Sequence, residues 1–132
     1  MIRAYKSYWK NFWNFRDRTS LDAYWWVVLL NIIIGIALLV FMYRSVAGLG
    51  FGFSNTTLPG PVAPIVFLIS WPVLNVIPGL AMTVRRLHDS GRSGAHYLFS
   101  LIPIVGIYIM IWFLTSKTKG PQANRYWYRP QV

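Results

Sequence analysis

Three long apolar segments alternate with polar stretches along the chain. The first runs over residues 21–43, the second over residues 62–84 and the third over residues 95–114. A helix rises about 1.5 Å per residue, so about 20 apolar residues match the hydrocarbon core of a bilayer. The pattern predicts an all-α, polytopic membrane protein with three hydrophobic helical segments in one membrane domain, residues 1–132.

The N-terminal residues 2–16 show helical periodicity. Aromatic and apolar side chains occupy one half of the helical wheel, and basic and amide side chains occupy the other half. This arrangement predicts an amphipathic helix at the membrane interface, although a helix packed on its own bundle uses the same face. The expected membrane anchors are tryptophans of this helix and of the start of the first segment: Trp9, Trp13, Trp25 and Trp26.

Proline and glycine interrupt the second and third segments. In the second, Asn75 lies between Pro72 and Pro78. A proline inside a helix kinks it and frees a carbonyl, so we expect Asn75 either to satisfy such a carbonyl or to bond a neighbouring helix. Asn31 is the polar residue inside the first segment. The third segment is interrupted at residues 103–106, where it either continues across the membrane or turns back as a re-entrant hairpin. Its length favours the span, which we adopt.

Charge adds an orientation and a conflict. The chain carries 13 Lys and Arg against 3 Asp and Glu, and charged residues make up 12% of it, half the fraction of about 25% typical of soluble domains. The basic residues flank apolar segments, so we expect anionic membrane lipids as partners and no nucleic acid. Positive flanks stay in the cytoplasm, which places the N-terminus and the polar loop 85–94 there. A third span then puts the basic tail, residues 115–132, outside, against the same rule.

The polar loop carries the candidate chemistry. It reads RRLHDSGRSG. Asp89 follows Arg85 and Arg86 by four and three residues, so it can form a structural ion pair with either on a helix. Gly91 is expected to end that helix and Ser93 to cap the next. Such an N-terminus beside arginines suits a phosphate. Two interpretations stay open: a helical corner, or an anionic headgroup site formed by Arg85, Arg86, His88, Arg92 and Ser93.

Other chemistry finds little support. The chain has no cysteine. His88 and Asp89 are adjacent and point apart on a helix, and His88 and His96 are eight residues apart, which is a poor metal-ligand spacing. We therefore predict no catalytic residue, no metal site and no cofactor.

Three function classes remain. We favour a structural or interaction protein that forms a homo-oligomer or binds a membrane-protein partner, and that binds anionic lipid headgroups at its loop. An oligomeric channel or small-solute transporter built on broken helices is one alternative. A membrane enzyme acting on lipid phosphates is the other.

Residues 85–94 resemble the signature of the DUF805 family, small bacterial inner-membrane proteins of uncharacterised function. The resemblance covers nearly the whole chain and implies a bacterial inner-membrane location, but no activity. The family's entry motif is matched only in part, because Asp17, Leu21 and Ala23 replace its glycine, second arginine and acid. Further matches lie at the entry, in the third segment and in the tail: Arg18, Tyr24, Trp25, Pro103, Gly106, Gly120, Asn124, Arg125 and Tyr126.

Overall fold

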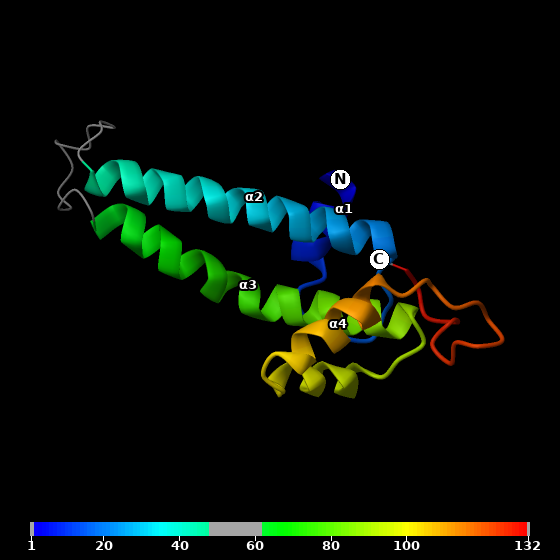
Figure 1. The fold of residues 1–132 in the computed structure, drawn as a ribbon. Coiled ribbons are helices and arrows are strands. Elements are labelled where there is room, and N and C mark those ends of the chain that lie inside the picture. Colours follow the sequence, from blue (N-terminus) through cyan, green and yellow to red (C-terminus); the bar gives the residue numbers. More distant parts are fainter. Residues whose placement is uncertain (1, 48–61, 132) are drawn as a thin grey trace. The chain divides into compact units, whose positions relative to one another are not determined.

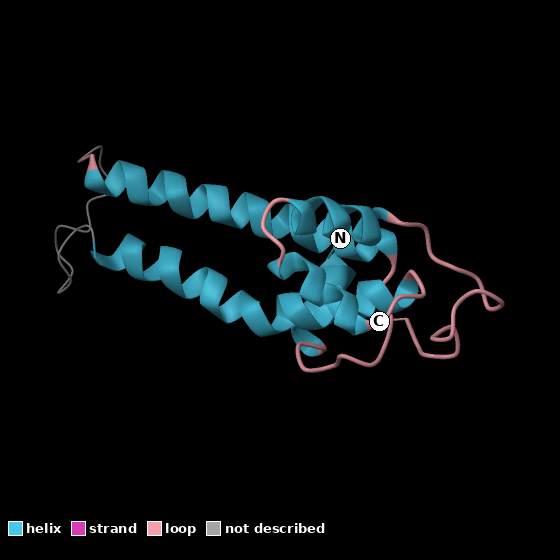
Figure 2. Ribbon diagram, turned by 60° about the horizontal axis from the view of Figure 1, so that its bottom comes forward, coloured by secondary structure: helices cyan, strands magenta, loops and turns pink. Residues whose placement is uncertain are grey.

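The computed structural model describes residues 2–47 and 62–131. Its elements in chain order are the helices α1 (Ile2–Lys10), α2 (Leu21–Val46) and α3 (Val62–Asp89), the 3₁₀ helix η1 (Gly94–Leu101) and α4 (Val105–Thr115) (Figure 1). The described residues contain no strand, only one isolated bridge between Arg18 and Gln131 (Figure 2). The predicted all-α class is confirmed.

Helix α2 starts at a polar cap and continues past its predicted end. The Ser20 hydroxyl accepts from the Ala23 amide at 3.4 Å, and the Ser20 carbonyl accepts from the Tyr24 amide at 3.0 Å. Such a cap satisfies amide groups that the first turn leaves open. With 26 residues, α2 measures about 39 Å, enough to cross a hydrocarbon core of about 30 Å.

Helix α3 runs without interruption through Pro72 and Pro78, so the second segment is not broken. The Asn75 amide donates to the Trp71 carbonyl at 2.8 Å. This contact is local, but the two prolines free the carbonyls four residues before them, at positions 68 and 74. The expectation that Asn75 bonds a proline-freed carbonyl is therefore not met by this contact.

The end of α3 extends into the predicted polar loop. Residues 85–89 belong to the helix, which ends at Asp89. Gly91 follows with a φ of 75°, as expected of a residue that ends a helix. The Gly91 amide donates to the His88 carbonyl at 3.0 Å, and the Arg92 amide donates to the Leu87 carbonyl at 2.8 Å. This pair of bonds is a Schellman motif, which favours glycine at the left-handed position.

Both long helices expose apolar side chains. Leu21–Ser45 and Ile65–Asp89 are long and apolar enough to cross a membrane. In the most apolar 18 residues of each, only 6% and 17% of the residues are buried. Ile36 of α2 is 56% exposed and Leu74 of α3 is 60% exposed. A core helix of a soluble protein buries such side chains. The apolar surface of these helices therefore suits lipid.

The chain divides into two compact units. One contains the described parts of residues 28–76, which are most of α2 and the first half of α3. The other contains residues 1–27 and 77–132, and we refer to it as the terminal unit. Its buried apolar residues come from α1, from the start of α2, from the end of α3 and from α4, and include Tyr8, Tyr24, Val27, Ala81, Met82, Leu87, Met110 and Phe113.

Within the terminal unit, the third apolar segment doubles back. Helix α4 packs on η1, and the ring of Phe113 lies 5.5 Å from His96 and 6.0 Å from Phe99. At the turn, Ile104 has a φ of 62° and a ψ of −65°, and the Val105 amide donates to the Pro103 carbonyl at 2.7 Å. These values describe a γ-turn, a strained conformation for a branched residue.

Gly106 allows the two arms to meet. A Cβ atom at this position would lie 2.0 Å from the Phe99 carbonyl oxygen, which only glycine avoids. Neither arm reaches across a bilayer core, because α4 has 11 residues and measures about 16 Å. The third segment is thus not one continuous helix. It has the shape of the hairpin alternative, against the span that its length favoured.

Helix α1 ends at Lys10, well before the predicted residue 16. The carbonyls of Asn11 and Asn14 accept hydrogen bonds from Arg85 Nη1, at 2.5 and 3.2 Å. They therefore do not serve as acceptors for a further helical turn. The aromatic residues also separate, since Tyr8 is buried and Trp13 is 67% exposed.

Candidate functional site

The end of α3 buries a run of polar side chains. Arg85 is 1% exposed, His88 is 7% exposed, and Arg86, Asp89 and Ser90 are 0% exposed. A buried charge is costly unless it is paired and hydrogen-bonded. The partners of these side chains therefore define what the site does.

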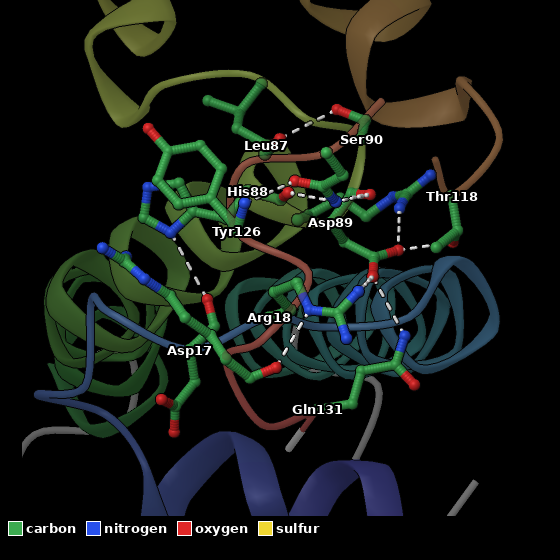
Figure 3. Close-up of polar contacts among 12 residues, drawn as sticks. Asp17, Arg18, Leu87, His88, Asp89, Ser90, Thr118, Tyr126 and Gln131 are labelled. Atoms are coloured by element: carbon green, nitrogen blue, oxygen red, sulfur yellow. Dashed lines mark hydrogen bonds and ion pairs between the residues drawn. The ribbon is translucent and has the colours of Figure 1, made fainter. Parts of the chain in front are cut away.

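Asp89 accepts four hydrogen bonds (Figure 3). Its Oδ2 accepts from Arg86 Nη1 at 2.6 Å and from Thr118 Oγ1 at 2.5 Å. Its Oδ1 accepts from Gln131 Nε2 at 2.9 Å and from Arg18 Nη1 at 3.4 Å. We name these five residues the Asp89 cluster. Its carboxylate joins the end of α3 to the segment before α2 and to the tail.

Arg85 binds the N-terminal segment, and it has no ion pair with a carboxylate in the described part of the chain. Its Nε donates to Thr19 Oγ1 at 3.1 Å, and its Nη1 donates to the Asn11 and Asn14 carbonyls. The Thr19 amide donates back to the Arg85 carbonyl at 3.2 Å. Main-chain oxygens replace water around this guanidinium, which explains how a cation with 1% exposure is tolerated.

Arg86 binds the end of α4. Its Nε donates to the Leu114 carbonyl at 3.0 Å, and its Nη2 donates to the Ser116 carbonyl. These are carbonyls at the C-terminus of α4, where the helix leaves acceptors open and where a cation suits the helix dipole. Arg86 therefore fixes the returning arm of the hairpin to α3.

The tail covers the last carbonyls of α3. Asn124, which is 2% exposed, donates from Nδ2 to the His88 carbonyl at 3.1 Å and to the Asp89 carbonyl at 3.0 Å. The Tyr126 ring stacks on His88 at 4.2 Å, while His88 Nδ1 lies 3.3 Å from the Asp17 carbonyl oxygen. Asn124 thus acts as a helix cap that is supplied from a distant segment.

The segment before α2 also contacts the tail. The Arg18 guanidinium lies 4.7 Å from the centre of the Trp127 ring, a cation–π contact. Its Nε donates to the Arg129 carbonyl at 3.1 Å, and Arg129 Nη1 donates to the Arg16 carbonyl at 2.7 Å. The two segments are therefore held together independently of Asp89.

The predicted headgroup residues differ in exposure. Arg85, Arg86 and His88 are buried and bound to the chain's own atoms, whereas Arg92 and Ser93 are half-buried. Of the two expected partners of Asp89, Arg86 forms the ion pair, at 2.6 Å, and Arg85 does not within the described structure; Arg18 forms a second pair at 3.4 Å.

Arg92 and Ser93 differ from these three residues. The Arg92 guanidinium lies 4.3 Å from the centre of the Phe113 ring and 5.4 Å from that of Trp112. Its Nη1 is buried and has no hydrogen-bond partner among the described residues. Burial lowers the pKa of Arg92, but an arginine keeps its charge. Ser93 Oγ accepts from the Ala95 amide at 3.1 Å and caps η1, as the sequence predicts.

The remaining predicted residues lie outside the Asp89 cluster. Trp9 is half-buried, Trp13 is exposed, and Trp25 and Trp26 are 37% and 44% exposed. Asn31 and Asn75 are half-buried on α2 and α3. In the part of the chain that the structure describes, no three His, Asp or Glu residues gather as a metal site would require.

Sequence reasoning missed most members of the Asp89 cluster. Thr118 and Gln131 carried no signal of their own, because isolated polar residues in a tail are common. Arg18 was marked only by the family resemblance, without a role, and the same holds for Asn124, which caps α3 outside the cluster.

The comparisons with known proteins agree with that resemblance. A family model described as "Protein of unknown function (DUF805)" matches residues 12–127. The chain is similar to the inner membrane protein YhaI of Escherichia coli K12, with 31% identity over 126 residues that cover 95% of this chain and 92% of the relative. It is also similar to the inner membrane protein YhaH of the same organism, with 31% identity over 127 residues, 93% of this chain and 92% of the relative. No solved structure matches it.

Proposed function

The chain belongs to the DUF805 family, and from that premise we propose a structural or interaction role in the bacterial inner membrane. In this proposal α2 and α3 cross the bilayer. The hairpin of η1 and α4 enters one leaflet, and both ends of the chain share the cytoplasmic side. Two features support the crossings: the length of α2 and α3, and the apolar side chains that they expose.

The observation that carries this topology is the return of the tail to α3. Thr118 and Gln131 donate to the Asp89 carboxylate, and Asn124 donates to the last carbonyls of α3. Segments joined by direct hydrogen bonds lie on the same side of a bilayer. With the tail on the side of residues 85–94, every Lys and Arg except Arg44 is cytoplasmic, and the charge conflict disappears.

The hairpin tip suits insertion into lipid. Leu101 is 74% exposed, Ile104 is 72% exposed and Val105 is 55% exposed. Water disfavours such a cluster of apolar side chains, whereas one leaflet of about 15 Å accommodates arms of about 16 Å. The tip is therefore placed in the cytoplasmic leaflet.

The proposed role follows from two features: the Asp89 cluster is fully hydrogen-bonded by the chain itself, and the apolar helix faces are exposed. The Asp89 cluster is filled by the chain's own donors, so it serves architecture. The surfaces left open are apolar helix faces, which lipids or other membrane helices cover. Association of such helices relies on packing and hydrogen bonds within the bilayer, so we place a second copy or a membrane-protein partner there. No contact described above supports a channel or a lipid-phosphate enzyme.

Paired reporter fusions test the topology. One reporter is active only in the cytoplasm and the other only outside it, and each is joined through a flexible linker after Val132 or after Ala47. We expect cytoplasmic activity after Val132 and external activity after Ala47. An external signal after Val132 contradicts the proposal, because the tail then lies across the membrane from its assigned partners.

Arg92 and Ser93 support a second candidate function, the binding of an anionic lipid headgroup. The specific observation is the buried Arg92 Nη1 that has no partner among the described residues, next to the capped start of η1. Native mass spectrometry with added phosphatidylglycerol tests it. Arg92→Gln should lower lipid retention, and Arg16→Gln, at an exposed arginine, should leave it unchanged. Equal retention in both variants contradicts this candidate.

A further inference from the structure

A pocket of about 450 Å³ opens in the terminal unit, away from the Asp89 carboxylate and the Arg92 side chain. Arg3 of α1, Ser20 before α2, Asp22 and Trp26 of α2, and Gln131 of the tail line it. Its volume lies within the range of about 300–1,000 Å³ that is common for small-molecule sites. The pocket joins one cation, one anion and one aromatic ring.

The two charges of this pocket are not used by the fold. Asp22 is exposed and has no ion pair or hydrogen bond with any described residue, although the chain carries 13 Lys and Arg. Arg3 is likewise exposed and unpaired among the described residues. By contrast, the buried Asp89 has two arginine partners. The pocket therefore presents opposite charges to a ligand.

From this arrangement we propose that the pocket binds the headgroup of a zwitterionic aminophospholipid, with the phosphate at Arg3 and the primary ammonium at Asp22. This inference rests on the proposed crossing of the bilayer by α2, which puts the start of that helix at the cytoplasmic interface. A phosphate and an ammonium on one ligand match the two unpaired charges.

The polar lining favours a primary ammonium over a quaternary one. An ammonium group has three N–H donors, and the lining offers three kinds of acceptor: the Asp22 carboxylate, the Ser20 hydroxyl and the Gln131 amide oxygen. Gln131 donates its Nε2 to Asp89, so its remaining polar atom is an acceptor. A choline group has no N–H and cannot use these acceptors.

The position of Trp26 favours a lipid over a free headgroup. It is 44% exposed and follows Trp25 at the start of an apolar helix, the place where tryptophan meets the headgroup layer. Trp26 and Ala23 give the pocket an apolar side. An amphiphile whose headgroup sits in the pocket thus extends toward the bilayer.

Native mass spectrometry of the full chain in detergent tests the inference with three lipids that share the same acyl chains. These are phosphatidylethanolamine, phosphatidylcholine and phosphatidylglycerol. We expect the protein to retain phosphatidylethanolamine in preference to the other two. Asp22→Asn should lower that retention by about fivefold, the upper range for an exposed charge pair.

Matched variants identify the site. Arg3→Gln should weaken retention of phosphatidylethanolamine, whereas Lys6→Gln, which removes an exposed cation of the same helix outside the pocket, should not. Asp17→Asn is the corresponding control for the acid. If Asp22→Asn retains phosphatidylethanolamine as the original chain does, the assignment is wrong.

Two further outcomes separate this inference from the proposed topology. In the first, soluble glycerophosphoethanolamine displaces the lipid when both are present at equal concentration. This result contradicts the lipid assignment, because the acyl chains then add nothing to the binding affinity. A cytoplasmic tail reporter together with no preference for phosphatidylethanolamine overturns the pocket and leaves the topology standing. An external tail reporter overturns the topology, whatever the lipid preference.

Discussion

Replacing Asp89 by asparagine removes the only carboxylate among the described residues that pairs with Arg18 and Arg86. Asp89 is 0% exposed and accepts four hydrogen bonds. The asparagine oxygen can keep two of these bonds, and the new NH₂ group faces the other donors. Hydrogen bonds to charged groups contribute about 1.5–3 kcal/mol each, so two lost bonds amount to about 3–6 kcal/mol. Breaking a buried pair by removing one partner typically costs about 3–5 kcal/mol.

Unfolding of purified protein in detergent micelles, by heat or by added denaturing detergent, measures this loss. Asp17→Asn is the matched control, because Asp17 is half-buried and forms no ion pair with a described residue. Its carboxylate accepts from Asn14 Nδ2 at 2.6 Å, a bond that the asparagine oxygen can retain. We expect the control to cost about 1 kcal/mol or less.

Limited proteolysis provides a second measurement on the same pair of variants. Loss of the Asp89 carboxylate removes one of its two tail donors, either Thr118 or Gln131, so trypsin should cleave after Lys117 and Lys119 faster in Asp89→Asn than in Asp17→Asn. If Asp89→Asn fails to accumulate, Thr118→Val removes a single bond to the same carboxylate and should still accelerate cleavage. Equal stability and equal cleavage in the two Asp→Asn variants would refute the assigned role of the Asp89 cluster.

Three other substitutions test separate parts of the fold by the same unfolding measurement. Gly106→Ala places a Cβ 2.0 Å from the Phe99 carbonyl oxygen and should cost about 1–3 kcal/mol, whereas Gly35→Ala, with nothing within 4 Å, should not destabilise. Equal effects would argue against the close approach of η1 and α4. Ile104→Gly should stabilise by about 1 kcal/mol because it relieves the φ of 62°, and a loss of stability would contradict that strain. Arg85→Lys should cost about 2–3 kcal/mol, since an ammonium cannot reach all three acceptors. An unchanged melting temperature of Arg85→Lys would show that the planar guanidinium of Arg85 is not needed for stability.

The long helices and the end of α3 were predictable because their signals are local. Apolar length alone identifies α2 and α3. Gly91 and Ser93 end one helix and cap the next through bonds to residues at most five positions away. Such features depend on a short stretch of chain, so the residue types in that stretch are sufficient to predict them.

The burial of Arg85 and Arg86 was not predictable. Their main acceptors are carbonyls at Asn11, Asn14 and Leu114, and a carbonyl is present in every residue type. Nothing in the composition of the N-terminal segment or of α4 marks these oxygens as partners. The sequence therefore suggested an exposed anion site where the chain binds itself.

The third segment shows a different limit. Its length favoured a span, which we adopted, although Pro103 and Gly106 marked a break. Two contacts favour the hairpin shape. Gly106 lies close to the Phe99 backbone, and Arg86 donates a hydrogen bond to the Leu114 carbonyl. Both depend on the three-dimensional approach of two arms.

The wide spacing of the Asp89 cluster has a consequence for biosynthesis. Arg18 precedes Asp89 by 71 residues and Gln131 follows it by 42. A ribosome that adds about 5–20 residues per second makes that glutamine about 2–8 seconds after the aspartate. In this interval Arg18 and Arg86 are already present, while Thr118, Asn124 and Gln131 arrive later. The N-terminal half of the cluster therefore assembles first, and the Asp89 carbonyl lacks its Lys119 and Asn124 donors until the tail has been made.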